Sequence, residues 1–175
     1  MNQEELNKYF STEWTEEFDK YALSGYDLVH KCRKRDWVLD VGCGYNPFKG
    51  SIKNLVAIDP ANTKADQVVT LEEFESDKLF DVAFCLGSIN FGNETKIRNQ
   101  IEKLLTHMKP SCKIFWRCNP GRSDHGKPST HKVPFFHWSE QWHETFCKDY
   151  GFELVELGTE IPEPNKRRIY AEWNR

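Results

Sequence analysis

The sequence predicts one α/β domain with a mostly parallel sheet of seven strands, of which the last runs antiparallel. Short apolar runs alternate with helical patterns, and the runs are nearly continuous, which is typical of strands buried on both faces. Only residues 159–166 separate the last two runs, which is too short for a parallel crossover. The expected strands are residues 37–41, 55–59, 67–70, 80–86, 112–118, 152–158 and 167–173.

The composition is that of an ordinary globular domain of 175 residues, with 38% hydrophobic, 14% aromatic and 29% charged residues. A net charge of −3 gives no overall basic field for nucleic acid. No apolar run approaches the roughly 18 residues that span a membrane. The polar start is neither a signal peptide nor a transit peptide, so we expect a cytoplasmic protein. The six cysteines form no C-x-x-C pair and are expected to be free thiols without a metal.

Helices are expected at the start of the chain. Aromatic residues recur at helical spacing over residues 9–23, and Ser11 or Thr12 is a candidate N-cap. Gly25 separates this helix from a short second one, Tyr26 to about Lys34. Residues 1–36 therefore form an expected helical lid on a core of residues 37–175. The spaced aromatic residues are Phe10, Trp14, Phe18 and Tyr21.

Two further helices are expected between the later strands. The first runs from Asn93 to Met108 and is stopped by Pro110. The second begins at the N-cap Ser139 and ends before Gly151. Residues 119–134, ahead of this helix, form a long predicted loop, and loops of that length inside a compact domain are usually functional.

A glycine turn follows the first strand. Glycine allows a positive φ and lets a ligand approach the backbone at Gly42 and Gly44. Ligands of open α/β sheets bind at the carboxyl edge, where this turn lies. Pro47 occupies the third glycine position of a dinucleotide fingerprint, and the next strand begins near Leu55. The helix between them is at most a turn or two, which suits an adenosine ligand without phosphates better than a pyrophosphate.

The second strand ends in Asp59, whose carboxylate can accept hydrogen bonds from two ribose hydroxyls. With this residue in register, the chain resembles class I, Rossmann-like S-adenosylmethionine-dependent methyltransferases. Asp40 to Gly44 matches the family's D-x-G-x-G motif, Asp59 its acidic residue, and residues 80–91 its fourth-strand motif. The antiparallel last strand also matches, and the resemblance covers residues 37–175.

The resemblance implies S-adenosylmethionine as cofactor and assigns expected roles. The turn of Gly42, Cys43 and Gly44 would line its methionine part, with Asp40 orienting the turn or holding the amino group. Asp59 and Pro60 would lie at the ribose. The adenine would be flanked by Thr70, Leu71 and Glu72, and the methionine part would also face Leu86, Gly87 and Ser88. Residues 61–65 are too few for the family's usual helix, so this is a pared-down member.

The resemblance implies an in-line methyl transfer but does not name the acceptor. Residues 86–91 lack the proline pair of DNA adenine methyltransferases. Cys85 lacks the proline that precedes the nucleophile of cytosine-C5 enzymes, and we expect it in the core. The segment 113–133 is basic. It is either a solvated loop or a cap for an anionic acceptor, and its charged residues are Lys113, Arg117, Arg122, Lys127 and Lys132 against Asp124.

Histidines recur every six residues from His125 to His143, a period that fits neither helix nor strand. A metal site is not favoured, and the candidates for a general base are His125, His131 and His137. We therefore expect methyl transfer to a small or anionic acceptor. Two alternatives stay open: a non-catalytic S-adenosylmethionine-binding partner protein, and an RNA or DNA methyltransferase of unrecognised type.

Overall fold

Six strands form one mixed sheet in the order β2-β1-β3-β4-β6-β5 in the computed structural model, which describes residues 3–12, 20–120, 134–164 and 166–175. β1, β2, β3 and β4 are parallel neighbours, whereas β6 runs antiparallel to both β4 and β5. The predicted antiparallel last strand is therefore confirmed. The strands are β1 (Val38–Val41), β2 (Leu55–Ile58), β3 (Phe80–Leu86), β4 (Met108–Cys118), β5 (Glu153–Glu163) and β6 (Lys166–Asn174).

The predicted third strand, residues 67–70, is wrong: within it only Gln67 pairs, in a single bridge with Ile58. A side chain takes the place of the missing strand, because the Asp66 carboxylate accepts a hydrogen bond from the Ala57 amide at 3.0 Å. Thr70 then opens a turn, in which its carbonyl accepts from the Phe74 amide at 3.0 Å. The chain thus turns away after one bridge, and β2 remains an edge strand.

The helices are α1 (Gln3–Thr12), α2 (Leu28–Lys31), α3 (Glu94–Thr106) and α4 (Glu140–Tyr150). The predicted caps of α4 are confirmed: the Ser139 side chain accepts from the Trp142 amide, and Gly151 ends the helix at φ +71°. α3 ends at Thr106, before the predicted end at Met108. Pro110 is not its stop, because Pro110 lies inside β4, which begins at Met108.

The first helix lies earlier in the chain than the aromatic spacing predicted. Ser11 and Thr12 are not N-caps, because they lie in the last turn of α1 and their hydroxyls donate to the Lys8 carbonyl at 3.1 and 2.7 Å. Trp14 and Phe18 fall outside the described residues. The second helix is a single turn. No described residue between β1 and β2 is in an α-helix, in keeping with the short connection.

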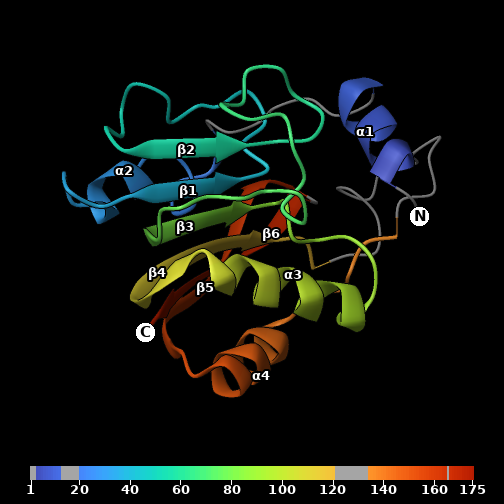
Figure 1. Ribbon diagram of the computed structural model, residues 1–175. Helices are drawn as coiled ribbons and strands as arrows, with labels where there is room; N and C mark the ends of the chain where they lie inside the picture. The colour runs from blue at the N-terminus through green and yellow to red at the C-terminus, as the bar shows by residue number, and fades with distance from the viewer. Residues whose placement is uncertain (1–2, 13–19, 121–133, 165) are drawn as a thin grey trace.

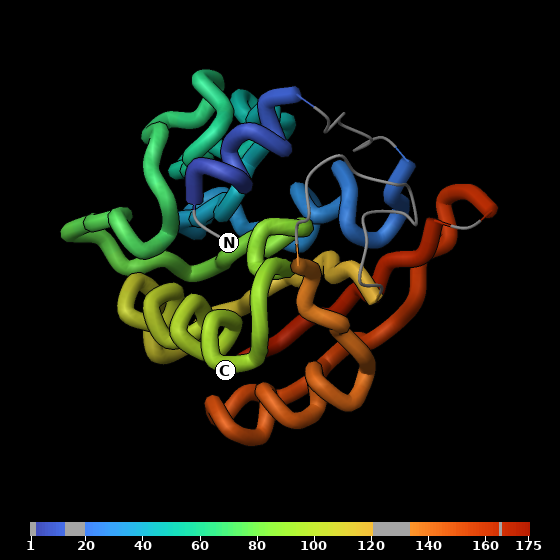
Figure 2. Tube along the Cα trace, turned by 90° about the vertical axis from the view of Figure 1, so that its right-hand side faces the viewer, coloured from blue at the N-terminus to red at the C-terminus, as the bar shows by residue number. Residues whose placement is uncertain are grey.

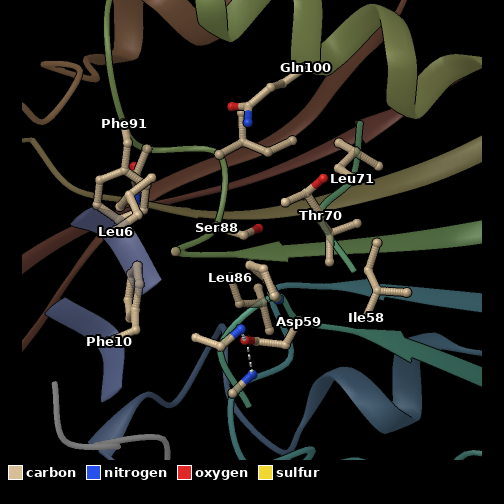
Figure 3. A pocket seen from close by; sticks show the side chains of 18 of the residues that line it. Leu6, Phe10, Ile58, Asp59, Thr70, Leu71, Leu86, Ser88, Phe91 and Gln100 are labelled. Atoms are coloured by element: carbon tan, nitrogen blue, oxygen red, sulfur yellow. Dashed lines mark hydrogen bonds between the residues drawn. The ribbon is translucent and has the colours of Figure 1, made fainter. Parts of the chain in front are cut away.

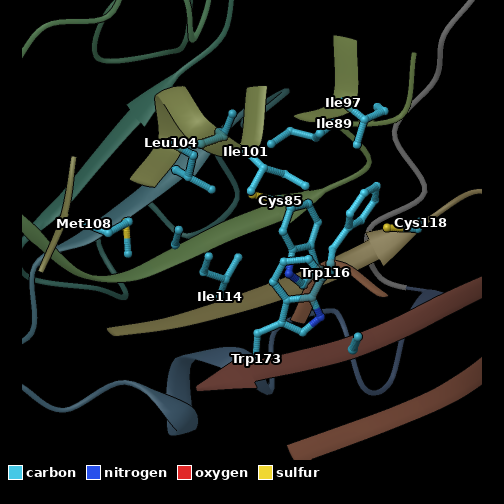
Figure 4. Packing of buried hydrophobic residues seen from close by; sticks show 14 of the residues in the cluster. Cys85, Ile89, Ile97, Ile101, Leu104, Met108, Ile114, Trp116, Cys118 and Trp173 are labelled. Atoms are coloured by element: carbon cyan, nitrogen blue, oxygen red, sulfur yellow. The ribbon is translucent and has the colours of Figure 1, made fainter. Parts of the chain in front are cut away.

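Buried hydrophobic clusters cover both faces of the sheet, and Figure 1 shows the helices α3 and α4 beside the strands. α3 and α4 pack on one face, where the Trp116 ring lies 4.6 Å from the Trp173 ring, centroid to centroid (Figure 4). On the other face, α2 and the segment after β1 bury Phe48 against Phe84. Full burial of each such side chain contributes roughly 1.5–3 kcal/mol, so the two clusters hold the strands in place.

The hairpin of β5 and β6 is tied to the segment that begins at residue 20, and the two run side by side in Figure 2. The buried Glu160 carboxylate accepts from the Leu23 amide at 2.6 Å and from the Ser24 hydroxyl. β5 forms the second edge of the sheet and is irregular, with register shifts between Leu154 and Glu156 and between Glu160 and Glu163. Among the described helices, none combines the length and the apolar character needed to cross a membrane.

Candidate functional site

A cavity lies at the carboxyl ends of β1, β2 and β3, and the α1 side chains Leu6 and Phe10 line it as well (Figure 3). The turns that follow these strands form one wall, and the side chains of α1 form another. The lining from the strand ends includes Gly42, Gly44, Asp59, Pro60, Leu71, Leu86, Gly87 and Ser88, and the lining from α1 includes Gln3, Leu6, Tyr9 and Phe10. Thr70 and Glu72 also line the cavity, so the structure brings together ten of the twelve residues that the sequence places at the cofactor.

Gly42 lies where two strand-end turns touch. Its φ is +68°, and a Cβ atom added there would lie 2.5 Å from the Cβ of Ser88. Ordinary carbon contacts are about 3.5–4.0 Å, so no larger residue fits. The Gly42 amide also donates to the Ile58 carbonyl at 2.8 Å. The glycine thus permits close contact between the turn after β1 and the turn after β3.

The Asp59 carboxylate holds the rim of the cavity together. Its Oδ2 accepts from the Gly44 amide at 2.9 Å, while Oδ1 accepts from the Ala61 and Asn62 amides at 2.8 and 2.9 Å. A carboxylate has about four lone-pair sites, so this geometry leaves one, on Oδ2. The sequence suggested two ribose hydroxyls at Asp59; the structure has room for one beside the backbone bonds.

Two buried polar atoms in the lining have no hydrogen-bond partner among the described residues, the Ser88 hydroxyl and the Gln100 side-chain oxygen. The Gln100 nitrogen donates to the Glu72 carboxylate at 3.0 Å, which fixes the amide. An unsatisfied buried polar atom costs about 1–3 kcal/mol, and a ligand in the cavity would remove that cost. Sequence analysis missed Gln100, because its position on α3 gave no motif.

Two predicted cofactor residues do not line the cavity. Asp40 is buried in the middle of β1, and Cys43 is buried in the turn that follows. Burial raises the pKa of the Cys43 thiol, so it is not a nucleophile. Cys85 is in the core as expected.

None of the candidate general bases is a described residue of the cavity lining. His125 and His131 lie outside those residues, and His137 is exposed and absent from the lining. His143 belongs to the core, stacked on Trp138, and burial lowers its pKa to about 3. The described residues contain no group of three or more His, Cys, Asp or Glu side chains placed to hold a metal.

The basic segment, residues 113–133, is likewise described only in part. Arg122, Asp124, Lys127 and Lys132 lie outside the described residues. Lys113 lies in β4 and pairs with Glu172 at 3.4 Å, away from the cavity lining. Arg117 does line the cavity, together with Arg168 of β6, which sequence analysis passed over as part of a strand.

Aromatic contacts attach α1 to the mouth of the cavity. Leu6, Tyr9 and Phe91 form a small buried cluster of their own. The Phe10 and Phe91 rings meet edge to face with centroids 5.5 Å apart, and Phe91 also meets Phe135 at 4.9 Å. This cluster separates the inner cavity from solvent on that side.

No protein-family model matches the chain, and no curated protein sequence matches it. Solved structures do match. A Burkholderia thailandensis 1,6-didemethyltoxoflavin-N1-methyltransferase, solved with 1,6-didemethyltoxoflavin and S-adenosylhomocysteine, aligns with TM-score 0.76 and 13% identity over 98% of this chain and 88% of its own. The Synechocystis magnesium protoporphyrin IX methyltransferase with S-adenosylhomocysteine gives TM-score 0.70 and 13% identity over 99% and 100%. The Bradyrhizobium japonicum N-methyltransferase NodS with the same ligand gives 0.59 and 15% over 80% and 78%.

At these identities the likenesses show the fold. The chain has the Rossmann-like fold of class I methyltransferases over nearly its whole length. It departs from the prediction in having six strands instead of seven among the described residues.

Proposed function

We propose that this chain is an S-adenosylmethionine-dependent methyltransferase that acts on a small acceptor molecule. The observation that carries the proposal is the cavity at the carboxyl ends of β1, β2 and β3, where the glycine turn and Asp59 lie within this fold. Solved structures with the same fold hold S-adenosylhomocysteine, which supports the choice of cofactor.

The residues present fit that cofactor. The remaining lone pair of Asp59 Oδ2 suits one ribose hydroxyl, and the partnerless Ser88 hydroxyl suits a polar group of the methionine part. Leu71 offers an apolar surface for the adenine, and the free Gln100 oxygen lies in the same lining. The close contact of Gly42 with Ser88 holds the turn after β1 against the turn after β3 at the carboxyl edge of the sheet.

Bound S-adenosylmethionine supplies an activated methyl group, whose carbon–sulfur bond breaks as the acceptor's lone pair forms the new bond. The chain has to align the acceptor behind that methyl group, and orientation of this kind is worth about 7–11 kcal/mol. The α1 cluster of Leu6, Tyr9 and Phe91 excludes water from one side. No described histidine lines the cavity; among the other described lining residues, Glu72 carries a carboxylate that can accept a proton.

The covering helix supports a small acceptor over a nucleic acid. Leu6, Tyr9 and Phe10 of α1 lie across the cavity, so a base of a duplex would have to displace them. Residues 1–36 thus serve as a lid on the core, as we propose from the placement of α1. The six cysteines are all free thiols, in keeping with a reducing cytoplasm as the proposed location.

Isothermal calorimetry with S-adenosylmethionine, S-adenosylhomocysteine and NAD tests the proposal. We expect micromolar binding of the first two ligands and none of NAD. Asp59→Ala should weaken both by about tenfold, the value of one hydrogen bond to a charged group. Asp77→Ala, an exposed carboxylate elsewhere, is the matched control. Equal affinity of Asp59→Ala and the wild type would exclude the ribose role, and tight binding without turnover on any acceptor would favour the non-catalytic alternative.

A further inference from the structure

Two arginines line the end of the cavity that lies beyond the proposed cofactor residues. In the sheet, β4 and β6 follow β3 on the side away from β1 and β2. Arg117 of β4 lies opposite Tyr170 of β6, and Arg168 is two residues from Tyr170. Arg117 and Arg168 are therefore diagonal neighbours on one face of the antiparallel pair, and both line the cavity.

Backbone carbonyls and a side-chain amide oxygen accept hydrogen bonds from the two guanidinium groups. Arg117 donates to the carbonyls of Ser24 and Leu86, each at 3.0 Å. Arg168 donates to the Asn119 side-chain oxygen at 3.2 Å. Asn119 is itself fixed, because its amide donates to the Asn90 oxygen at 3.1 Å. This support keeps the arginines ordered before any ligand binds, which lowers the entropy cost of binding.

The two arginines place like charges close together at this end of the cavity. Burial is the largest cause that lowers the pKa of Arg117, and the charge of Arg168 lowers it further. Tyr21, Glu160 and Asp40 act in the opposite direction, and the Glu160 oxygens accept bonds from Leu23 and Ser24. An anionic ligand between the two arginines would offset their repulsion and would meet two planar donor groups.

Aromatic side chains also line the cavity that holds the arginines. The Arg117 Cζ lies 4.1 Å from the centroid of the Tyr21 ring. Tyr9, Phe91 and Phe135 are further members of the lining. Aromatic walls favour a flat or apolar ligand body, because such surfaces bury it without unpaired polar groups.

We propose that this end of the cavity is the acceptor site and that the acceptor is a small organic acid with an apolar or planar body. Its carboxylate or phosphate group lies against Arg117 and Arg168. Guanidinium hydrogen bonds draw electron density from the anion, so this group anchors the acceptor and a different atom receives the methyl group. The inference rests on the proposed function, because the methyl donor defines which end remains for the acceptor.

Matched acid and amide probes test the inference. Indole-3-acetamide is the uncharged analogue of indole-3-acetate, with an NH2 group in place of one carboxylate oxygen, and phenyl phosphate presents a phosphate on a smaller aromatic body. With S-adenosylhomocysteine saturating, calorimetry should show the acid binding at least tenfold tighter than the amide. Arg168→Gln should abolish that preference. Arg167→Gln is the matched control, because Arg167 is the exposed neighbour on the same strand and should keep the preference. A higher affinity of phenyl phosphate than of indole-3-acetate would assign the site to phosphates.

Three results would overturn the inference: equal affinity of acid and amide for the wild type, a preference that survives Arg168→Gln, or a tenfold loss of S-adenosylhomocysteine affinity in Arg168→Gln. The last would place the arginine at the cofactor's own carboxylate. If Arg168→Gln fails to fold, Arg168→Lys keeps the charge without the planar donor group and should reduce the preference severalfold; an unchanged preference would refute the site. Failure of the wild type to bind S-adenosylhomocysteine would instead refute the proposed function, and the acid–amide comparison without cofactor would still test the arginines.

Discussion

Replacement of Gly42 by alanine should destabilise the protein through contact with Ser88 as well as through backbone strain. A Cβ at Gly42 would lie 2.5 Å from the Ser88 Cβ and 3.4 Å from its Cα. Overpacking of this kind costs typically about 1–3 kcal/mol. The φ of +68° adds about 1–2 kcal/mol for any residue with a side chain. We therefore expect Gly42→Ala to lower the free energy of unfolding by about 2–5 kcal/mol in urea titrations.

Gly151→Ala separates the two contributions, because Gly151 has φ +71° and open space around its Cα. It should cost only the backbone term, about 1–2 kcal/mol. Ser88→Gly removes the contacted Cβ and should rescue most of the remaining loss in Gly42→Ala, whereas Ser88→Ala keeps that Cβ and should not. Equal costs of Gly42→Ala and Gly151→Ala, or equal rescue by the two Ser88 variants, would refute the argument from close contact.

Two further predictions concern buried titratable groups. His143 has a pKa of about 3 in the fold against 6.5 unfolded, so the unfolded state binds more protons between these values. Stability should be fully present above pH 6.5 and fall towards pH 3, with a slope of up to about 1.4 kcal/mol per pH unit. His143→Phe should flatten the difference in urea midpoint between pH 7.5 and pH 5, and an unchanged slope would exclude this histidine as the cause. Ellman's reagent should modify no thiol of the native protein quickly, because burial raises the pKa of even the half-exposed Cys32 to about 12, and should modify all six in urea; rapid native labelling would contradict this.

Strands that are apolar over most of their length were predictable from the sequence. Residues 80–86, apolar except for Asp81, are an example, because a parallel strand covered on both faces admits few polar side chains. Residues 67–70 look just as favourable, yet they form no strand. No strand forms there because the Asp66 side chain accepts the hydrogen bond of the Ala57 amide and because a turn begins at Thr70. The pattern of apolar residues along the chain could not reveal that the Asp66 side chain would accept the hydrogen bond of a neighbouring strand.

Site residues that belong to a sequence motif were predictable. Site residues that reach the cavity only through the arrangement of the strands were not. Asp59 follows an apolar strand, so its place at the sheet edge could be inferred. Arg168 looks like any charged residue at the start of a strand, and only the order β3-β4-β6 brings it beside Arg117. Asp40 matches a motif but is buried away from the cavity lining, so a motif match did not guarantee contact.

The two edges of the sheet also bear on how the protein behaves at high concentration. At β2, Asp66 already occupies the Ala57 amide that a foreign strand would need. At β5, Pro162 offers no amide hydrogen, and two register shifts disrupt the straight ladder that a neighbour would extend. Edge-to-edge aggregation would first require local unfolding at either side. The same features that make the sheet irregular therefore protect it against fibril growth.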